Sequence, residues 1–214
     1  MPGMTPLFIN LAGRPVVIVG GGSVGERKAR FFREAEVSVI SPTFTRGLER
    51  MGAAGELRLI RRKVTGDTFD ELFAGAFLVV ATTDDIGLNA EVYRFCREHG
   101  ILVNAAAGPT DVVVPSMSEC GEIAIAVSTG GRSPAMARRL RRRLEAAITD
   151  DDRAMVRLQE ALRARLKPLV GNQQERERLL SRVLEDERVW AALKVSESRA
   201  LELALQVIDA RSKT

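Results

Sequence analysis

The chain has 214 residues, 45% of them hydrophobic and 28% charged, which suits one domain of ordinary size together with a smaller one. No apolar run approaches the length needed to cross a bilayer, and the N-terminus lacks a basic stretch followed by an apolar one. We therefore expect a cytoplasmic protein with no membrane partner. With a net charge of +4, only 5% aromatic residues and no recognisable nucleic-acid motif, no nucleic-acid partner is expected. Cys96, Cys120 and the single histidine, His99, lack metal-ligand spacing, so we expect reduced thiols and no metal site.

A glycine-rich turn follows the first predicted strand. Residues 16–19 form an apolar run typical of a strand buried on both faces, and the spacing Gly20-x-Gly22-x-x-Gly25 precedes a helical pattern. In a dinucleotide-binding turn the first glycine permits the bend, the second lets the backbone approach a pyrophosphate, and the third lets helix and strand pack closely. The N–H groups of the helix N-terminus then face the phosphates. The alternative is a glycine-rich bend with no ligand.

Strands and helices alternate from this turn to about residue 110. Strands are predicted at residues 37–40, 57–60, 77–81 and 101–104, and their alternation with helices predicts a doubly wound parallel sheet. Polar residues at the carboxyl ends of such strands line the ligand crevice, although Asp84 or Asp85 is equally suited to cap the next helix. The residues expected to bind the cofactor are Gly20, Gly22, Ser23, Val24, Gly25, Ser41, Pro42, Thr43 and Thr82. Ser41 stands where an acidic residue would select NAD, so the choice between NAD and NADP is left open.

The pattern changes from Asp111 onward. Residues 112–115 and 123–127 look like strands, and residues 116–122 between them are typical of turns. A helix is expected to follow, with Ser133 as its N-cap and Pro134 at its first position. The backbone before it either cradles an anion or is an ordinary capped helix start. From about residue 143 to the end the periodicity is helical, with a break at residues 168–171.

Arginines are concentrated at the start of this helical part. Five lie within six positions: Arg138, Arg139, Arg141, Arg142 and Arg143. Such a cluster either binds a polyanion or is solvated surface. In a helix Arg138 and Arg142 share one face, whereas Arg139 and Arg143 share another. We therefore expect only part of the cluster to face one ligand.

Several of these stretches occur in an order that resembles the precorrin-2 dehydrogenase family. This family is the NAD-dependent module of siroheme synthases, and some of its members are also sirohydrochlorin ferrochelatases. The stretches that carry the resemblance are residues 6–8, 13–28, 81–85 with Asn89, 103–104 and 128–134. The resemblance covers roughly residues 5–145, and it extends to the helical tail only in length and character.

The resemblance implies an α/β architecture with a Rossmann-like, NAD-binding domain over residues 1–112, a dimerisation segment over 113–146 and a helical domain over 147–214. It also implies that a homodimer oxidises precorrin-2 to sirohydrochlorin with NAD as the hydride acceptor. The polycarboxylate tetrapyrrole would then be held by Asn104, Arg132, Ser133, Arg138 and Arg142. Arginines suit this role because they form bidentate hydrogen bonds with carboxylates.

One stretch departs from the family pattern. After the fifth strand the family reads Val-Asn-Val-Val-Asp, and that aspartate is the proposed acid–base or metal-handling group. Residues 103–107 of this chain read Val-Asn-Ala-Ala-Ala, so Ala107 stands in the place of the aspartate. Because alanine neither accepts a proton nor holds a metal, we expect dehydrogenase activity without ferrochelatase activity, with Asp111 as the candidate replacement carboxylate. The alternative is a non-catalytic NAD-binding regulatory or interaction module.

Overall fold

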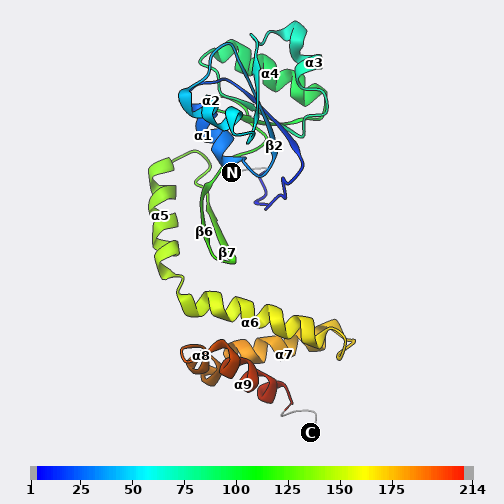
Figure 1. Cartoon of the computed structure of the whole chain (residues 1–214), viewed down its shortest axis with the longest axis vertical. Helices are drawn as coiled ribbons and strands as arrows, with labels where there is room; N and C mark the ends of the chain where they lie inside the picture. Colours follow the sequence, from blue (N-terminus) through cyan, green and yellow to red (C-terminus); the bar gives the residue numbers. More distant parts are fainter. Residues whose placement is uncertain (1–3, 210–214) are drawn as a thin grey trace. The chain divides into compact units, whose positions relative to one another are not determined.

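The computed structural model describes residues 4–209 and divides the chain into two compact units, with the boundary between Val114 and Pro115 (Figure 1). The first unit is an α/β structure, and the second contains a β-hairpin and helices. The three-part division expected from the sequence, with boundaries after residues 112 and 146, stays a prediction.

The first unit is built on a five-stranded, all-parallel sheet in the order β3-β2-β1-β4-β5. Its strands are β1 (Pro15–Val19), β2 (Glu36–Ser41), β3 (Arg58–Arg61), β4 (Leu78–Ala81) and β5 (Leu102–Ala105). Its helices are α1 (Ser23–Phe31), α2 (Arg46–Ala53), the 3-10 turn η1 (Gly66–Thr68), α3 (Phe69–Leu72) and α4 (Ile86–Glu98). The five predicted strands and the Rossmann-like fold are confirmed. Because the order reverses between β1 and β4, the carboxyl ends of these two strands mark the position where such sheets bind ligands.

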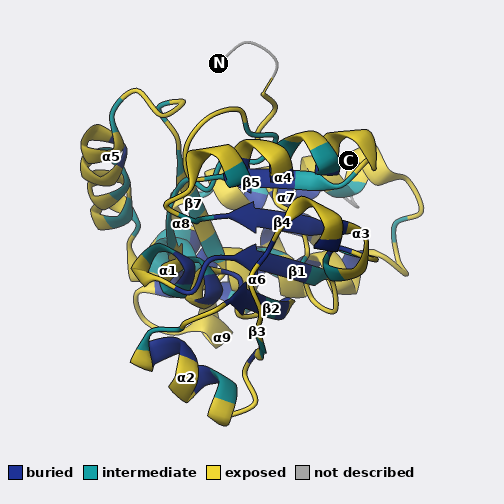
Figure 2. Ribbon diagram, turned by 90° about the horizontal axis from the view of Figure 1, so that it is seen from above, coloured by how far each residue is buried: buried dark blue, intermediate teal, exposed yellow. Residues whose placement is uncertain are grey.

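Both faces of the sheet are covered by helices. Successive strand residues point to opposite faces, so Ile18 packs with Ala29 of α1 and Leu48 of α2, whereas Val79 packs with Val92 of α4 on the other face. Figure 2 shows β1 and β4 in the buried colour. Burial of each large apolar side chain contributes about 1.5–3 kcal/mol. The continuous apolar runs of the sequence therefore reflect strands that are buried on both sides.

The prediction of a strand at residues 112–115 is wrong. After β5 the chain turns back, and the backbone N–H groups of Asp111 and Val112 both donate to the carbonyl oxygen of Val103 at 2.9 Å. Val112 and Val114 pack against the core beside α1, so their apolar character serves that core rather than a strand. The strand begins after Pro115, in the stretch that the sequence analysis interpreted as a turn.

The second unit begins with an antiparallel hairpin of β6 (Ser116–Cys120) and β7 (Ile123–Val127), whose turn contains Gly121 at φ +64°. Helix α5 (Pro134–Ala147) follows, and Ser133 caps it, as expected, by accepting a hydrogen bond from the N–H of Met136. The remaining helices are α6 (Asp150–Leu166), α7 (Gln173–Glu185), α8 (Glu187–Leu193) and α9 (Glu197–Asp209). The predicted break at residues 168–171 lies between α6 and α7.

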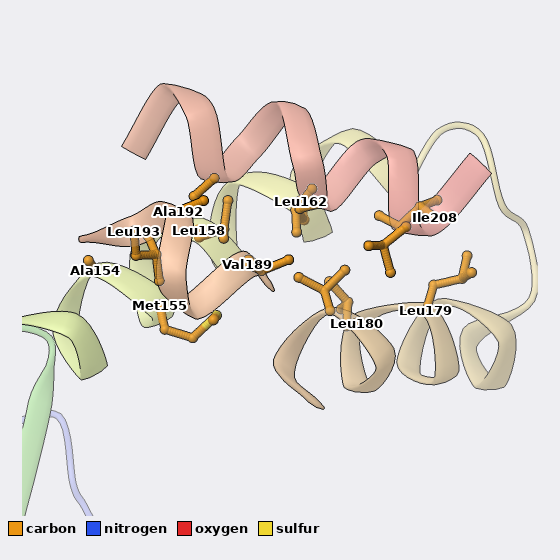
Figure 3. Close-up of a cluster of buried hydrophobic side chains, with 14 of the residues drawn as sticks. Ala154, Met155, Leu158, Leu162, Leu179, Leu180, Val189, Ala192, Leu193 and Ile208 are labelled. Atoms are coloured by element: carbon orange, nitrogen blue, oxygen red, sulfur yellow. The ribbon is translucent and has the colours of Figure 1, made fainter. Parts of the chain in front are cut away.

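Helices α6 to α9 enclose one apolar core. Figure 3 shows Leu162 of α6, Leu180 of α7, Val189 of α8 and Ile208 of α9 in this cluster. Most of the apolar residues that recur at helical spacing after residue 150 are core positions, but Leu169 and Leu184 are exposed, and a core position is wrong for these two. Within residues 4–209, no helix is both long enough and apolar enough to cross a membrane.

Candidate cofactor-binding site

The glycine turn connects β1 to α1 at the point where the strand order reverses. Gly20 adopts φ +119°, and a Cβ there would lie 2.8 Å from the backbone oxygen of Thr82. A Cβ on Gly25 would lie 2.0 Å from the backbone oxygen of Gly20. These two glycines are therefore required by backbone conformation and by close packing of the turn itself.

Gly22 differs from both, because nothing within the unit requires it to lack a side chain. Its φ is −80°, its position is exposed, and a Cβ there would meet no atom within 4 Å. The first turn of α1, with Ser23 and Val24, therefore begins beside open space. A dinucleotide pyrophosphate fits this arrangement, since a bare backbone permits the closest approach of phosphate oxygens.

The N-terminus of α1 also lacks the side-chain cap that most helices of the chain possess. Gly22 supplies no side-chain hydrogen bond to the first turn. By contrast, seven helices begin at a side chain that accepts a backbone N–H bond: Thr45, Asp85, Ser133, Thr149, Asn172, Asp186 and Ser196. The N–H groups and the positive dipole end of α1 thus suit an anion.

The loop after β2 packs directly on this turn. A Cβ on Gly21 would lie 2.0 Å from the backbone oxygen of Thr43 and 2.9 Å from the Cβ of Ser41. The Oγ1 of Thr45 donates to the Oε2 of Glu26 at 2.6 Å, and this hydrogen bond holds the pKa of Glu26 below its usual value. The loop that contains Ser41, Pro42 and Thr43 is thereby tied to α1. No acidic side chain occupies positions 41–43.

The end of β4 lies on the other side of the turn. Thr82 donates to the carbonyl oxygen of Val19 through its backbone nitrogen and its Oγ1, both at 2.9 Å. The next residue, Thr83, is held by buried Asn89, whose Nδ2 donates to the Thr83 carbonyl at 2.9 Å. Asp85 caps α4 through the N–H of Leu88. The nine residues expected at the cofactor site thus gather at one edge of the sheet.

Asn104, near the end of β5, is buried and forms a hydrogen bond at each end of its side-chain amide. Its Oδ1 accepts a hydrogen bond of 2.6 Å from the Nζ of Lys28, and its Nδ2 donates to the carbonyl oxygen of Val112 at 2.6 Å. Burial, with a smaller effect from the neighbouring charge of Arg27, lowers the pKa of Lys28 to about 8. Asn104 therefore links α1 to the segment that follows β5.

Asp111 does not point toward the glycine turn. Its carboxylate pairs with Arg97 at 3.1 Å, in the last turn of α4. Helix α4 begins after the carboxyl end of β4 and returns to the amino end of β5, so Arg97 lies toward the opposite edge of the sheet. A catalytic role for Asp111 stays a prediction, and its carboxylate would first have to leave this ion pair.

The remaining predicted substrate residues belong to the second unit. Arg132, Arg138 and Arg142 are exposed and take part in none of the ion pairs found between residues 4 and 209. Arg141, in contrast, pairs with Glu145, which also accepts a hydrogen bond from Ser118 of β6 at 2.8 Å. One member of the arginine cluster therefore has a structural role, whereas Arg138 and Arg142 form no ion pair with a described carboxylate. Their contact with substrate stays a prediction.

The described part of the chain contains no group of three or more His, Cys, Asp and Glu side chains arranged to hold a metal ion. Both cysteines are free and buried. Burial raises the pKa of the Cys96 thiol to about 12, with a smaller contribution from Asp111. Cys96 is consequently a packing residue on the α4 face of the sheet.

The sequence analysis overlooked Lys28 as a site residue. Lys28 follows Gly25 by three positions and precedes Ala29, and both of these neighbours are buried against the sheet. A lysine on the inner side of a helix was the available signal, since residues three apart share a face. The partner of Lys28 was not predictable, because Asn104 lies 76 residues further along the chain.

Two family models match the chain. One, described as putative NAD(P)-binding, matches residues 7–116, and the other, described as sirohaem biosynthesis protein central, matches residues 121–147. The precorrin-2 dehydrogenase of Methanosarcina barkeri is 39% identical over 208 residues, which are 95% of this chain and 93% of that protein. The siroheme synthase of Nitrosococcus oceani is 34% identical over 94% of this chain, which spans only 44% of that longer relative. The solved structure of SirC, a precorrin-2 dehydrogenase, has a TM-score of 0.73 at 25% identity, covering 95% of this chain and all of SirC.

Proposed function

This chain belongs to the precorrin-2 dehydrogenase family, and from that premise we propose that it oxidises precorrin-2 to sirohydrochlorin in siroheme biosynthesis. The reaction removes a hydride and a proton from the macrocycle. Bound NAD supplies the acceptor for the hydride. The observation that carries the proposal is the uncapped N-terminus of α1 beside Gly22, at the point where the sheet reverses its strand order.

The residues of the chain bind and orient the two reactants. The backbone N–H groups of Ser23 and Val24 would hold the pyrophosphate, and Gly20, Gly25 and Thr82 would keep the turn in the required shape. The arginines Arg132, Arg138 and Arg142 would hold substrate carboxylates by bidentate hydrogen bonds, assisted by the backbone around Ser133. Orientation and electrostatics are what a protein contributes when its cofactor carries the chemistry.

We also propose that the protein acts as a cytoplasmic homodimer on this polycarboxylate tetrapyrrole, without a nucleic-acid or membrane partner. Two free, buried cysteines are consistent with a reducing compartment. The dimer is what the family resemblance implies for residues 113–146, and the sirohaem biosynthesis protein central family matches residues 121–147 within this segment. Size-exclusion chromatography with light scattering would test it, and a monomer at micromolar concentration would contradict it.

Anaerobic absorbance spectroscopy of precorrin-2 mixed with the protein tests the reaction. We expect sirohydrochlorin to appear only when NAD is present. Ferrous or cobaltous ion added afterwards should enter the macrocycle no faster than in a protein-free control, because Ala107 offers neither a base nor a metal ligand. Absence of conversion despite measurable NAD binding would instead favour a non-catalytic NAD-binding regulatory or interaction module.

A further inference from the structure

Lys28 is a half-buried cation held in one orientation. Its Nζ donates to the Oδ1 of Asn104 at 2.6 Å. Asn104 is 5% exposed, and its Nδ2 is committed to the carbonyl oxygen of Val112 at 2.6 Å. Since an amide nitrogen donates and a carbonyl oxygen accepts, this second bond fixes which end of the amide faces the lysine. The ammonium is therefore anchored to the sheet rather than free in solvent.

The ammonium lies at the edge of the sheet where the cofactor residues gather. Asn104 is paired with Val80, and the next pair, Ala81 with Ala105, is the last in the register of β4 with β5. Helical side chains tilt toward the helix N-terminus, and the N-terminus of α1 is at the glycine turn. The side chain of Lys28 is thus directed from the body of α1 toward the carboxyl ends of the strands.

No carboxylate among residues 4–209 forms an ion pair with Lys28. The charge that acts on Lys28 is that of Arg27, which is also positive. A partly buried charge without a counter-ion is unfavourable. An amide oxygen satisfies one of the three ammonium protons but supplies no negative charge.

We propose that the Lys28 ammonium is the counter-ion for an anionic oxygen of a bound ligand at the β5 end of this edge. The oxygen belongs to a carboxylate of the tetrapyrrole or to a phosphate of the dinucleotide. This assignment rests on the proposed function for the identity of both ligands. Asn104, predicted above to contact substrate, is on this view a positioning residue that holds Lys28 in place.

Binding titrations of three variants of the full chain test the assignment. Lys28→Met removes the charge but keeps most of the chain length, Lys28→Arg keeps the charge, and Arg27→Gln removes an exposed charge one residue away as the matched control. NAD and sirohydrochlorin are titrated separately by fluorescence or absorbance, so no turnover is needed. If wild-type protein fails to oxidise precorrin-2, the proposed function fails while these titrations still report on Lys28.

We expect Lys28→Met to lower the affinity for one of the two ligands by about 10- to 100-fold, which is the loss typical of a hydrogen bond to a charged group. Lys28→Arg should recover most of that affinity, and Arg27→Gln should stay within about twofold of wild type. If Lys28→Met loses affinity only for sirohydrochlorin, the anionic group that Lys28 contacts is a carboxylate. If it loses affinity only for NAD, that group is a phosphate. Equal affinities of Lys28→Met and wild type for both ligands would overturn the assignment, as would equal losses in Lys28→Met and Arg27→Gln.

Chemical labelling of the wild-type protein provides a readout that does not depend on the folding of a variant. Acetic anhydride modifies exposed amines, and mass spectrometry of the digest reports the extent at each lysine. Bound NAD or sirohydrochlorin should slow acetylation of Lys28 at least about fivefold when at least about four-fifths of the protein carries the ligand, because only the unliganded fraction then reacts. Exposed Lys63 serves as the reference. Unchanged labelling of Lys28 with a saturating concentration of each ligand would contradict the proposal.

Discussion

The Oγ1 of Thr82 donates a 2.9 Å hydrogen bond to the carbonyl oxygen of Val19, which also accepts the backbone N–H of Thr82 at 2.9 Å. These bonds join the carboxyl ends of β4 and β1 where the strand order reverses. A Cβ on Gly20 would lie 2.9 Å from the same hydroxyl. Thr82 therefore shapes the glycine turn from the neighbouring strand.

Thr82→Val retains the branched shape of this side chain but loses the hydroxyl. We expect the free energy of unfolding, measured by urea denaturation, to fall by about 1 kcal/mol, because one partly buried hydrogen bond is lost. NAD affinity should fall as well, because the glycine turn loses a hydrogen bond that holds it against β4. Thr82→Ser is the control, as it retains the hydroxyl and should bind NAD like wild type. Identical stability and affinity in Thr82→Val and wild type would contradict the role of this bond.

Gly22→Ala and Gly25→Ala should separate ligand binding from folding. A Cβ at Gly22 would meet no atom within 4 Å, so the free energy of unfolding of Gly22→Ala should lie within about 1 kcal/mol of the wild-type value. The same variant should bind NAD at least about tenfold more weakly, because the Cβ would occupy space that the pyrophosphate needs. Gly25→Ala places a Cβ 2.0 Å from the Gly20 oxygen and should lower stability directly. Calorimetric titration and thermal denaturation measure the two effects. Wild-type NAD affinity in Gly22→Ala would remove the basis for a pyrophosphate at α1.

The two faces of the arginine cluster should differ in their effect on substrate. Replacing Arg138 and Arg142 together by alanine should raise the KM for precorrin-2 by about tenfold or more and leave NAD affinity unchanged, because carboxylate contacts are lost. Replacing Arg139 and Arg143 removes the same charge from the other face and should change KM much less. Equal KM values in the two double variants would show that only net charge matters.

Lys28 should make the stability of the protein depend on pH in the alkaline range. Its pKa in the folded state is about 8, whereas an unfolded lysine titrates near 10.4. Between these values the unfolded chain binds more protons, so the contribution of Lys28 to the free energy of unfolding increases as pH rises from about 8 to 10.4. Urea denaturation at several pH values should show wild type gaining stability relative to Lys28→Met in this window. Parallel curves for the two proteins would contradict a lowered pKa.

Much of the first unit follows from local sequence patterns. The apolar run at residues 16–19 predicted β1, and the spacing of Gly20, Gly22 and Gly25 predicted the turn before α1. The cap at Ser133 was equally predictable, since a side chain that bonds to a backbone N–H three residues later is a local event. The edge at which Ser41 and Thr82 meet the glycine turn followed from the parallel direction of the strands.

The sequence alone thus determined the alternation of strands and helices, the glycine turn and its position at the carboxyl edge of the sheet, because these depend on neighbours a few residues apart. Only the tertiary structure decided that Lys28 reaches Asn104, that Asp111 pairs with Arg97, and that residues 116–120 form a strand. Each of these depends on a partner supplied by a different element. A side chain in a helix, a loop or a hairpin acquires its role from the element that packs against it, and the local pattern of residues does not specify that element.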